Sequence, residues 1–463
     1  MELRLLNPPE TRLSSFTVKS SNKNPHKKTS HPPSVGLQFS KKELSRILRT
    51  DAAVEAIEKK SNSSKYKTLW PKPVLEALDH AIKLNRWESA LKIFGLLRKQ
   101  DWYEPRCQTY AKLLVMLGKS NQPNQASLLL ETMLLDGLQP TLDVYTALVG
   151  AFAHNGHFDI AFSILEDMKS VPNCKPDAFT YSILIKHCIK LHRFDMIKPI
   201  LDEMSLSRIE CTTVTYNILI DGYGKAKRFE LMESSLVEMI QTGETHPDIF
   251  TFNSVIGAYG GCKRINEMEK WFDEFQLMGL KPDIMTFNIL IKSYGKSGLF
   301  QKMGSVVEFM TKRLYSPTIV TYNIIIETFG KAGNIEKMDE IFLKMKQEGM
   351  KPNCITYSSL VYAYGKAGIL SKVDSILRQV ENSDVVIDTT FFNCAISAYG
   401  NTGDVEKMME LFRAMEGNGC KPDSMTFATI LDVLRARGMV EIARNFERNI
   451  IGAKNSSFRQ LVF

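Results

Sequence analysis

Hydrophobic residues recur along most of the chain at the spacing of amphipathic helices. In the stretch 284–296, IMTFNILIKSYGK, the residues Phe287, Ile291 and Tyr294 lie three or four positions apart, so one helical face is apolar. A second stretch, 299–313, has an apolar stripe of its own. This pattern predicts two short amphipathic helices in succession.

Glycine and proline mark the ends of these helices. Gly295 and Gly298 lie between the two stripes, where glycine loosens or ends a helix. Second helices are followed by G-x-x-P-D or G-x-x-P-N, as at 279–283, 349–353 and 419–423. Glycine permits the left-handed conformation that stops a helix, and proline prevents its continuation. The unit is therefore a helix–turn–helix hairpin of about 35 residues.

The aromatic residue that precedes each apolar run marks the same hairpin ten times. Successive aromatic residues are separated by 35 or 36 positions. They are Tyr110, Tyr145, Tyr181, Tyr216, Phe252, Phe287, Tyr322, Tyr357, Phe392 and Phe427. One hairpin cannot bury its apolar face alone, so neighbouring hairpins must stack into an all-α solenoid.

Composition changes this picture only at the N-terminus. The 463 residues carry 59 basic and 51 acidic side chains, a formal net charge of +8. Residues 1–40 hold six of the basic and two of the acidic side chains, and they are rich in Ser and Thr. That composition is typical of an organelle transit peptide. Because only two of the six basic residues are Arg, we expect a chloroplast rather than a mitochondrion, which stays the alternative.

The cysteines and histidines do not form a recognisable catalytic or metal site. None of the eight cysteines belongs to a C-x-x-C pair, so we expect free thiols in a reducing compartment. The H-x-E…C-x-x-C signature of zinc deaminases is absent, and GYGKAK at 222–227 lacks the P-loop pattern. No apolar run approaches the roughly 20 residues of a membrane span. We therefore expect no enzyme activity, no metal, no cofactor and no membrane association.

The repeated unit carries the motif T-[YF]-N-x-L-I, followed by G, M and G-x-x-P-D. This motif resembles that of the pentatricopeptide repeat proteins, P-class, of the plant organelle type. The resemblance implies a right-handed α-solenoid superhelix of stacked helix–turn–helix repeats of 35 residues. The tetratricopeptide repeat is less similar, because its period is 34 and it opens with W-x-x-L-G-x-x-Y.

The resemblance also divides the chain into regions. Residues 1–40 are the expected transit peptide, 41–71 an N-terminal capping helix and linker, 72–106 a degenerate repeat and 459–463 a tail. Ten repeats, numbered 1 to 10 below, lie between: 107–141, 142–177, 178–212, 213–248, 249–283, 284–318, 319–353, 354–388, 389–423 and 424–458.

Pentatricopeptide repeats bind single-stranded RNA, with one base per repeat read by two or three side chains. The resemblance implies that the fifth and last residues of each repeat read the base. In repeats 2 to 9 these pairs are Thr146/Asp177, Ser182/Thr212, Asn217/Asp248, Asn253/Asp283, Asn288/Thr318, Asn323/Asn353, Ser358/Asp388 and Asn393/Asp423. By the family's code they suggest a core site near 5′-GnUUYYGU-3′, with the N-terminal repeats toward the 5′ end.

These residue types suit base recognition. An Asn amide offers one acceptor and two donors to a pyrimidine edge, whereas the shorter Thr and Ser leave room for a purine. Neither position belongs to the apolar set of the hairpin, so we expect that packing does not determine its identity. The alternative is structural, because Asn, Ser and Thr commonly cap helices and Asp is common in turns.

Two further series complete the expected RNA site. The second residue of a repeat can press against a base face; these residues are Phe179, Val214, Phe250, Met285, Val320 and Ile355. The thirteenth residue can contact phosphates; these residues are Lys119, Lys190, Lys225, Lys296, Lys331 and Lys366. Six such contacts would give a salt slope of about −4. The alternative for the lysines is a favourable position at a helix C-terminus.

Two classes of function remain. The first is a monomeric, sequence-specific single-stranded RNA-binding protein of an organelle, which acts by occupancy in transcript processing, splicing, stabilisation or translation. The second is a helical scaffold for protein partners in an organellar ribonucleoprotein assembly. The restriction of the fifth position to Asn, Ser and Thr in repeats 2 to 9 favours the first, because a scaffold would not need it.

Overall fold

The computed structural model describes residues 71–453, and within that range the chain forms helices and no strands. The chain divides into two units, Met1–Glu104 and Pro105–Phe463. The all-α class and the stacked helical hairpins expected from the sequence are confirmed. The expected transit peptide, nearly all of the N-terminal capping helix and linker, the end of repeat 10 and the tail lie outside the described residues.

The described part of the first unit is one hairpin, at the place of the degenerate repeat. Helices α3 (Pro71–Lys83) and α4 (Trp87–Arg98) pack against each other. Val74 and Leu78 of α3 and Ile93 and Leu97 of α4 are buried. The i, i+4 spacing of these residues gives each helix the apolar stripe that a hairpin needs.

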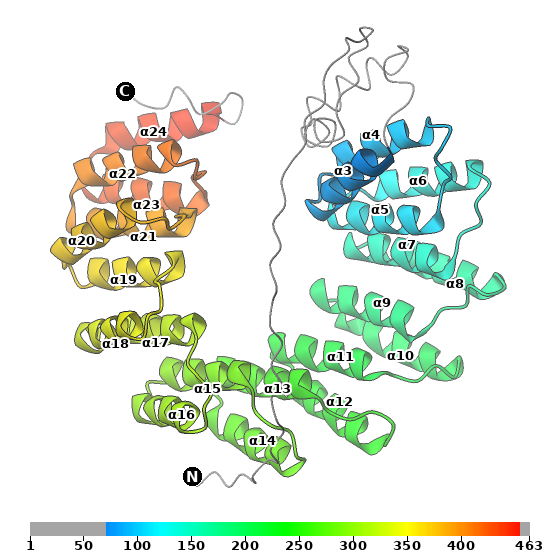
Figure 1. Ribbon diagram of the computed structural model, residues 1–463, viewed down its shortest axis with the longest axis horizontal. Coiled ribbons are helices and arrows are strands. Elements are labelled where there is room, and N and C mark those ends of the chain that lie inside the picture. Colours follow the sequence, from blue (N-terminus) through cyan, green and yellow to red (C-terminus); the bar gives the residue numbers. More distant parts are fainter. Residues whose placement is uncertain (1–70, 454–463) are drawn as a thin grey trace, which may run out of the picture. The chain divides into compact units, whose positions relative to one another are not determined.

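In the second unit each repeat contributes a first and a second helix (Figure 1). The first helices are α5 (Cys107–Lys119), α7 (Leu142–His154), α9 (Ala178–Lys190), α11 (Thr213–Lys225), α13 (Ile249–Gly261), α15 (Ile284–Lys296), α17 (Ile319–Lys331), α19 (Cys354–Lys366), α21 (Thr389–Thr402) and α23 (Ser424–Ala436). The second helices are α6 (Pro123–Leu135), α8 (Phe158–Ser170), α10 (Ile197–Leu206), α12 (Phe229–Gln241), α14 (Ile265–Leu277), α16 (Phe300–Lys312), α18 (Ile335–Gln347), α20 (Leu370–Glu381), α22 (Val405–Gly417) and α24 (Val440–Ala453). A short 3-10 helix, η2 (Phe194–Met196), precedes α10.

The first helices carry the main contacts between repeats. Helix α11, for example, packs against its own second helix α12 and against the neighbouring first helices α9 and α13. Tyr216 and Ile220 lie in these interfaces and are buried. Burying an aliphatic side chain such as Ile220 stabilises the fold by about 1.5–3 kcal/mol. The first helices from α5 to α23 therefore form one continuous row.

Two glycines that the sequence treats alike have different roles. Helix α15 ends at Lys296, and Gly298, with φ of +74°, adopts the left-handed conformation expected after a helix end. Gly295 instead lies inside α15, where a Cβ atom would overlap Thr328 Cγ2 of α17. Gly295 lets the adjacent first helices α15 and α17 approach each other closely. This corrects the expectation that Gly295 loosens or ends the helix.

Hydrogen bonds from tyrosine hydroxyls also join four of the first helices, α13, α15, α19 and α21, to the preceding repeat. The Tyr294 hydroxyl on α15 donates to Glu269 Oε1 on α14 at 2.8 Å, and Lys302 Nζ lies 2.6 Å from the same oxygen. Burial, followed by the hydrogen bond to Glu269 and its charge, raises the pKa of Tyr294, so the phenol stays a donor. Equivalent pairs are Tyr259–Glu233, Tyr364–Asp339 and Tyr399–Asp374.

Candidate nucleic-acid interface

The last residue of each repeat precedes the first helix of the next repeat. Asp283 is the N-cap of α15, and its Oδ1 accepts the backbone N–H of Thr286 at 2.7 Å. The Thr286 hydroxyl oxygen accepts the backbone N–H of Asp283 at 3.1 Å. This capping box shows that the last position has a structural role whatever else it does.

The fifth residue of a repeat joins the same cap from the preceding helix. Asn253 Nδ2 on α13 donates to Asp283 Oδ1 at 3.3 Å, and Asn253 Oδ1 accepts the Thr286 hydroxyl at 2.7 Å. We call such a set a junction triad, because its three residues span a repeat boundary. The same arrangement recurs as Asn217–Thr251–Asp248, Asn323–Thr356–Asn353 and Asn393–Thr426–Asp423.

Repeats with a hydroxyl at the fifth position can make a shorter connection. Thr146 Oγ1 lies 2.9 Å from Thr180 Oγ1, and Ser182 Oγ lies 2.9 Å from Thr215 Oγ1. The threonine at the third position therefore hydrogen-bonds to the fifth residue of the preceding repeat at six boundaries, through Thr180, Thr215, Thr251, Thr286, Thr356 and Thr426.

In the described part of the chain, Asp388 is the last-position aspartate that no hydrogen bond joins, directly or through a threonine, to the fifth residue of the same repeat, Ser358. It is exposed and is the N-cap of α21, where its Oδ1 accepts the backbone N–H of Phe391 at 2.9 Å. Phe391 occupies the third position of repeat 9, so no threonine hydroxyl is present there to bridge Asp388 to the buried Ser358. Within residues 71–453 no hydrogen bond joins these two side chains. The Ser358/Asp388 pair differs in this respect from the other pairs with aspartate, whose members are joined directly or through a threonine.

Asn288 is the exception among the fifth-position asparagines. The last residue of the same repeat is Thr318. The backbone N–H and the hydroxyl of Thr318 both contact Thr321 Oγ1, at 3.1 Å and 3.2 Å. Asn288 Oδ1 is buried and has no hydrogen-bond partner. A buried acceptor without a partner is destabilising by about 1–3 kcal/mol. Near-identical helices, α11 and α15, thus place their asparagines in different surroundings.

Burial corrects one expectation about the fifth position. Seven of the eight expected residues, from Thr146 to Ser358, are only 2–9% exposed, and Asn393 is half-buried. A buried position that hydrogen-bonds to the next repeat restricts the residue type by itself. The preference for Asn, Ser and Thr therefore does not separate an RNA-binding protein from a scaffold, contrary to the expectation from the sequence.

Hydrogen bonds keep two of the capping carboxylates ionised. Burial alone would raise the pKa of Asp283, but donors from Thr286 and Asn253 lower it below its ordinary value. The backbone N–H of Thr426 and the side chains of Asn393 and Thr426 lower the pKa of Asp423. Since these folded pKa values lie below the unfolded value of about 3.9, the stabilisation is present above that pH and is lost in stronger acid.

The second residue of each repeat from 3 to 8 is exposed although it is apolar. The six expected residues, Phe179, Val214, Phe250, Met285, Val320 and Ile355, are between 53% and 63% exposed. Isolated exposed apolar residues are ordinary, but one per repeat at a fixed position makes a row.

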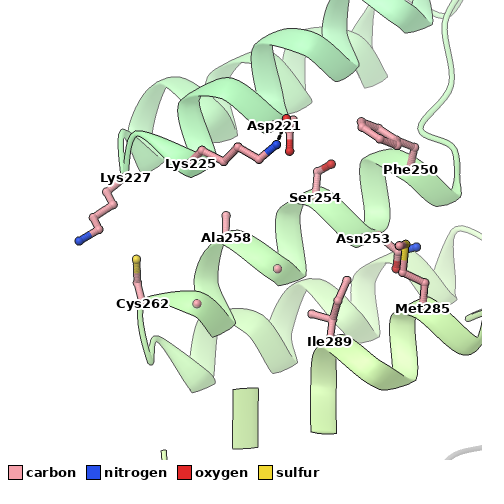
Figure 2. A pocket seen from close by; sticks show the side chains of 13 residues that line it. Asp221, Lys225, Lys227, Phe250, Asn253, Ser254, Ala258, Cys262, Met285 and Ile289 are labelled. Carbon is pink, nitrogen blue, oxygen red and sulfur yellow. Dashed lines mark hydrogen bonds and ion pairs between the residues drawn. The ribbon is translucent and has the colours of Figure 1, made fainter. Parts of the chain in front are cut away.

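A pocket shows how these positions meet (Figure 2). It has a volume of about 480 Å³ and lies between α11, α13 and α15. Phe250, Asn253 and Met285 lie at one end, and Lys225, beside Asp221, lies toward the other. Gly257 contributes no side chain to the lining. The pocket therefore combines an apolar end, a buried amide and a charged end.

The thirteenth-position lysines are not equivalent. Lys225 pairs with Asp221 at 2.6 Å on its own helix, and Lys331 pairs with Glu327 in the same way. Within residues 71–453, Lys119, Lys296 and Lys366 make no ion pair. Lys190 Nζ lies 3.1 Å from His154 Nε2. The row of positive charge is therefore stronger in some repeats than in others.

The third residue of each repeat is a member of the site that sequence reasoning missed. Thr180, Thr215, Thr251, Thr286, Thr321, Thr356 and Thr426 are completely buried. Each begins the T-[YF] pair of the repeat motif, but the motif was interpreted only through its aromatic residue and the fifth-position residue that follows. A buried hydroxyl at a fixed position needs hydrogen-bond partners, and that requirement is the signal that could have identified it.

Other kinds of site find no support in the described part of the chain. No group of three or more His, Cys, Asp or Glu residues between 71 and 453 could hold a metal ion. No helix in that range is both long and apolar enough to cross a bilayer. All eight cysteines are free thiols.

A stack of 35-residue helical hairpins with polar junctions at six of the boundaries between repeats defines a helical-repeat protein. The model of the PPR repeat family matches residues 140–190, 247–296, 282–330, 317–366 and 387–435. The pentatricopeptide repeat domain matches 197–262, and the PPR repeat matches 355–385. These matches cover more than half of the chain, which therefore belongs to the pentatricopeptide repeat family.

Plant proteins are similar to parts of this chain. Pentatricopeptide repeat-containing protein At3g53170 of Arabidopsis thaliana is 61% identical over 52% of this chain and 54% of its own length. Pentatricopeptide repeat-containing protein At5g48730, chloroplastic, from the same plant is 46% identical over 52% of this chain and 47% of its own length. The chain spans about half the length of these curated relatives.

Two solved structures match this chain at low sequence identity. The pentatricopeptide repeat protein PPR10 in complex with an 18-nt psaJ RNA element has a TM-score of 0.42 and 19% identity, covering 87% of this chain and 64% of that chain. Yeast Rmd9p in complex with a 16-nt target RNA has a TM-score of 0.41 and 14% identity, covering 90% and 91%.

Proposed function

We propose that this chain is a sequence-specific single-stranded RNA-binding protein of an organelle. The observation that carries the proposal is the pocket in which the buried Asn253 lies beside two exposed apolar side chains, Phe250 and Met285. A flat base can stack against apolar groups while its polar edge meets the amide. Membership of a family that reads one base per repeat supports this use of the pocket.

The junction triad supports a preference for uracil. Asn253 Nδ2 gives one proton to Asp283 and keeps a second for a carbonyl oxygen of the base. Asp283 receives the triad's bonds on Oδ1, so its other carboxylate oxygen can accept the N3–H of uracil. Cytosine presents a lone pair at N3, which a carboxylate repels.

Other junctions support other bases. Asn353 can donate as well as accept, so the Asn323/Asn353 pair tolerates cytosine beside uracil. Thr146 hydrogen-bonds to Thr180 and leaves more space beside Asp177, which suits a purine. These preferences support the first, third, fourth, sixth and eighth positions of the core site near 5′-GnUUYYGU-3′, with the N-terminal repeats toward the 5′ end.

The guanine at the seventh position depends on Ser358 and Asp388. The short Ser358 side chain leaves room for a purine, and the exposed Asp388 carboxylate can accept the N1–H of guanine. Because no hydrogen bond within residues 71–453 joins Asp388 to Ser358, we expect this position to be less selective than the first, where Thr180 links Thr146 to Asp177.

A binding selection on random RNA tests this assignment. We expect uracil to be enriched at the third, fourth and eighth positions, opposite repeats 4, 5 and 9. Asn217→Thr should change the third position from uracil toward guanine, while the eighth position, read by Asn393, serves as the internal control. Selected RNA without uracil at these positions would contradict the proposal.

We further propose that the protein acts in the chloroplast, by occupancy rather than by catalysis. The names of the relatives At5g48730 and At3g06430 describe them as chloroplastic. A bound segment of transcript would be protected from exonucleases or kept accessible for splicing or translation. RNA immunoprecipitation with sequencing from chloroplast extract should recover a defined footprint. Recovery of protein partners without any enriched transcript would favour the scaffold instead.

A further inference from the structure

The threonine at the third position of repeats 5, 6 and 10 completes a hydrogen-bond network around an asparagine of the preceding repeat. Thr251 is completely buried, and its hydroxyl donates to Asn217 Oδ1 at 2.6 Å. The hydroxyl oxygen accepts the backbone N–H of Asp248 at 3.1 Å, and Asp248 Oδ1 lies farther from it, at 3.0 Å, than Asn217 Oδ1 does. Because a hydroxyl has a single proton, its closest acceptor is the amide oxygen, which is therefore engaged inside the protein.

The network favours one orientation of the amide. Asn217 Nδ2 donates to both carboxylate oxygens of Asp248, at 3.2 Å each. If the amide turned over, its oxygen would lie against the carboxylate, and the hydroxyl of Thr251 would lose its closest acceptor. Two further pairs repeat the contact between hydroxyl and amide oxygen: Thr286 with Asn253 at 2.7 Å, and Thr426 with Asn393 at 2.6 Å. In all three repeats the amide nitrogen keeps the remaining proton for a ligand.

The threonine does not line the pocket that the asparagine lines. Phe250, Asn253 and Met285 are among the residues around the pocket between α11, α13 and α15, and Thr286 is not (Figure 2). Thr286 is completely buried. A base in this pocket would meet Asn253 without meeting the threonine, so any effect of Thr286 on recognition must pass through the amide.

One junction keeps the threonine but lacks this contact. Thr321 is completely buried and makes a capping box with Thr318. Within residues 71–453 no hydrogen bond joins Thr321 to Asn288, and Asn288 Oδ1 is buried without a partner. Removal of the Thr321 hydroxyl would therefore disturb a helix cap of the same kind without releasing an amide oxygen.

We propose that the threonine at the third position is a positioning residue that determines how strictly the asparagine of the preceding repeat selects uracil over cytosine. The proposal rests on the function proposed above. While the hydroxyl engages its oxygen, the amide offers the base an N–H, which suits the carbonyl oxygen at C4 of uracil. An amide oxygen released from the hydroxyl can accept the amino group at C4 of cytosine. The pairs concerned are Thr251 with Asn217, Thr286 with Asn253, and Thr426 with Asn393.

The test uses four single variants of the full chain. Thr251→Val and Thr286→Val remove the hydroxyl from two triads that read different bases, and Thr251→Ser retains a hydroxyl. The control is Thr321→Val, which removes the same hydroxyl from a capping box without an amide contact. Thermal unfolding followed by circular dichroism verifies that each variant is folded at the temperature of the binding measurements.

Affinity is measured by isothermal titration calorimetry with the octanucleotide GAUUUUGU and with GACUUUGU, GAUCUUGU and GAUUCUGU, which carry cytosine at the third, fourth or fifth position. We expect the unsubstituted protein to prefer uracil about tenfold at the third and fourth positions. Thr251→Val should lower this preference to about threefold or less at the third position alone, and Thr286→Val at the fourth position alone. Thr251→Ser and Thr321→Val should leave every preference within about twofold of that of the unsubstituted protein.

A purely structural role of the threonine gives a different result. If Thr251→Val and Thr286→Val weaken binding equally for all four RNAs and leave the preferences unchanged, the threonine is only a helix cap and the inference fails, although RNA binding stands. A change of the fifth-position preference in Thr321→Val would also overturn it, because no amide oxygen is released there. If the unsubstituted protein binds none of the RNAs, or binds all four equally well, the function proposed above fails and the inference fails with it.

Discussion

Asn288 shows how one residue can separate two repeats whose helices are nearly identical. Its carbonyl oxygen is buried without a hydrogen bond because Thr318 engages Thr321 differently from an aspartate. We expect Thr318→Asp to create the triad seen at Asn253, and to raise the free energy of unfolding by about 1 kcal/mol. The fifth base of the selected RNA should change from either pyrimidine to uracil. Chemical denaturation and a binding selection measure the two effects.

Thr212→Asp is the matched control for this substitution. It places the same carboxylate at a helix N-cap, but the fifth residue of that repeat is Ser182 rather than Asn. We expect an effect on stability through the cap and no gain of uracil at the second base. A uracil preference in the control would mean that the carboxylate alone selects the base.

Burial explains why the residue scale was the hardest to predict from sequence. The fifth and last positions were identified, but the hydrogen bonds that join them through Thr286 and its equivalents were not. The absence of a hydrogen bond between Asp388 and Ser358 was not predicted either. It follows from Phe391, which replaces the threonine three residues after Asp388. Periodicity identifies which side chains face a neighbouring helix, whereas a three-residue hydrogen-bond network depends on the distance between two helices. The pairing of Lys225 with Asp221 follows from their i, i+4 spacing and was predictable.

At the scale of the helix, the close approach of α15 and α17 depends on Gly295. We expect Gly295→Ala to destabilise the fold by about 1–3 kcal/mol, because the added methyl group would overlap Thr328 and the helices would have to separate. The midpoint and slope of a guanidinium unfolding curve measure this change.

We expect Gly304→Ala on α16 to stabilise the protein, although it is the same chemical change as Gly295→Ala. A Cβ atom at Gly304 meets no heavy atom within 4 Å. The substitution should therefore stabilise the protein by up to about 1 kcal/mol through helix propensity alone. Destabilisation by both substitutions would show that helix packing is not what distinguishes the two positions.

Helix ends were more predictable than helix contacts. The G-x-x-P-D segments and the glycine after each first helix mark the ends of helices, and Gly298 adopts the expected conformation. Gly295 was assigned the wrong role because glycine inside a helix and glycine after a helix look the same in a sequence. Only the distance between α15 and α17 distinguishes them.

For the whole molecule, the proposed RNA binding should depend on salt to an extent set by the acidic partners of two lysines. Four thirteenth-position lysines have no carboxylate partner among the described residues, so we expect a slope of about −3 in a plot of log affinity against log salt concentration. Asp221→Asn with Glu327→Gln should release Lys225 and Lys331 and make the slope steeper by about 1. Fluorescence anisotropy at several salt concentrations measures both slopes, and equal slopes would contradict this account.

The 35-residue repeat and the all-α class followed directly from the sequence, because a regular period requires no knowledge of distances. The electrostatic difference between repeats did not follow from the total charge of +8. It arises from which lysines have an acid one turn earlier on the same helix.

The junction triads change what counts as a module of this protein. A segment cut at the repeat boundary, such as 249–283, carries Asn253 and Asp283 but leaves Thr286 behind. Its transplantation into another array would preserve the complete triad only if the recipient repeat also has a threonine at its third position. Repeat 9 has Phe391 there, so a graft placed before it would lose the hydrogen bonds that the threonine hydroxyl makes. Units for recombination should therefore be cut after the third residue of the following repeat.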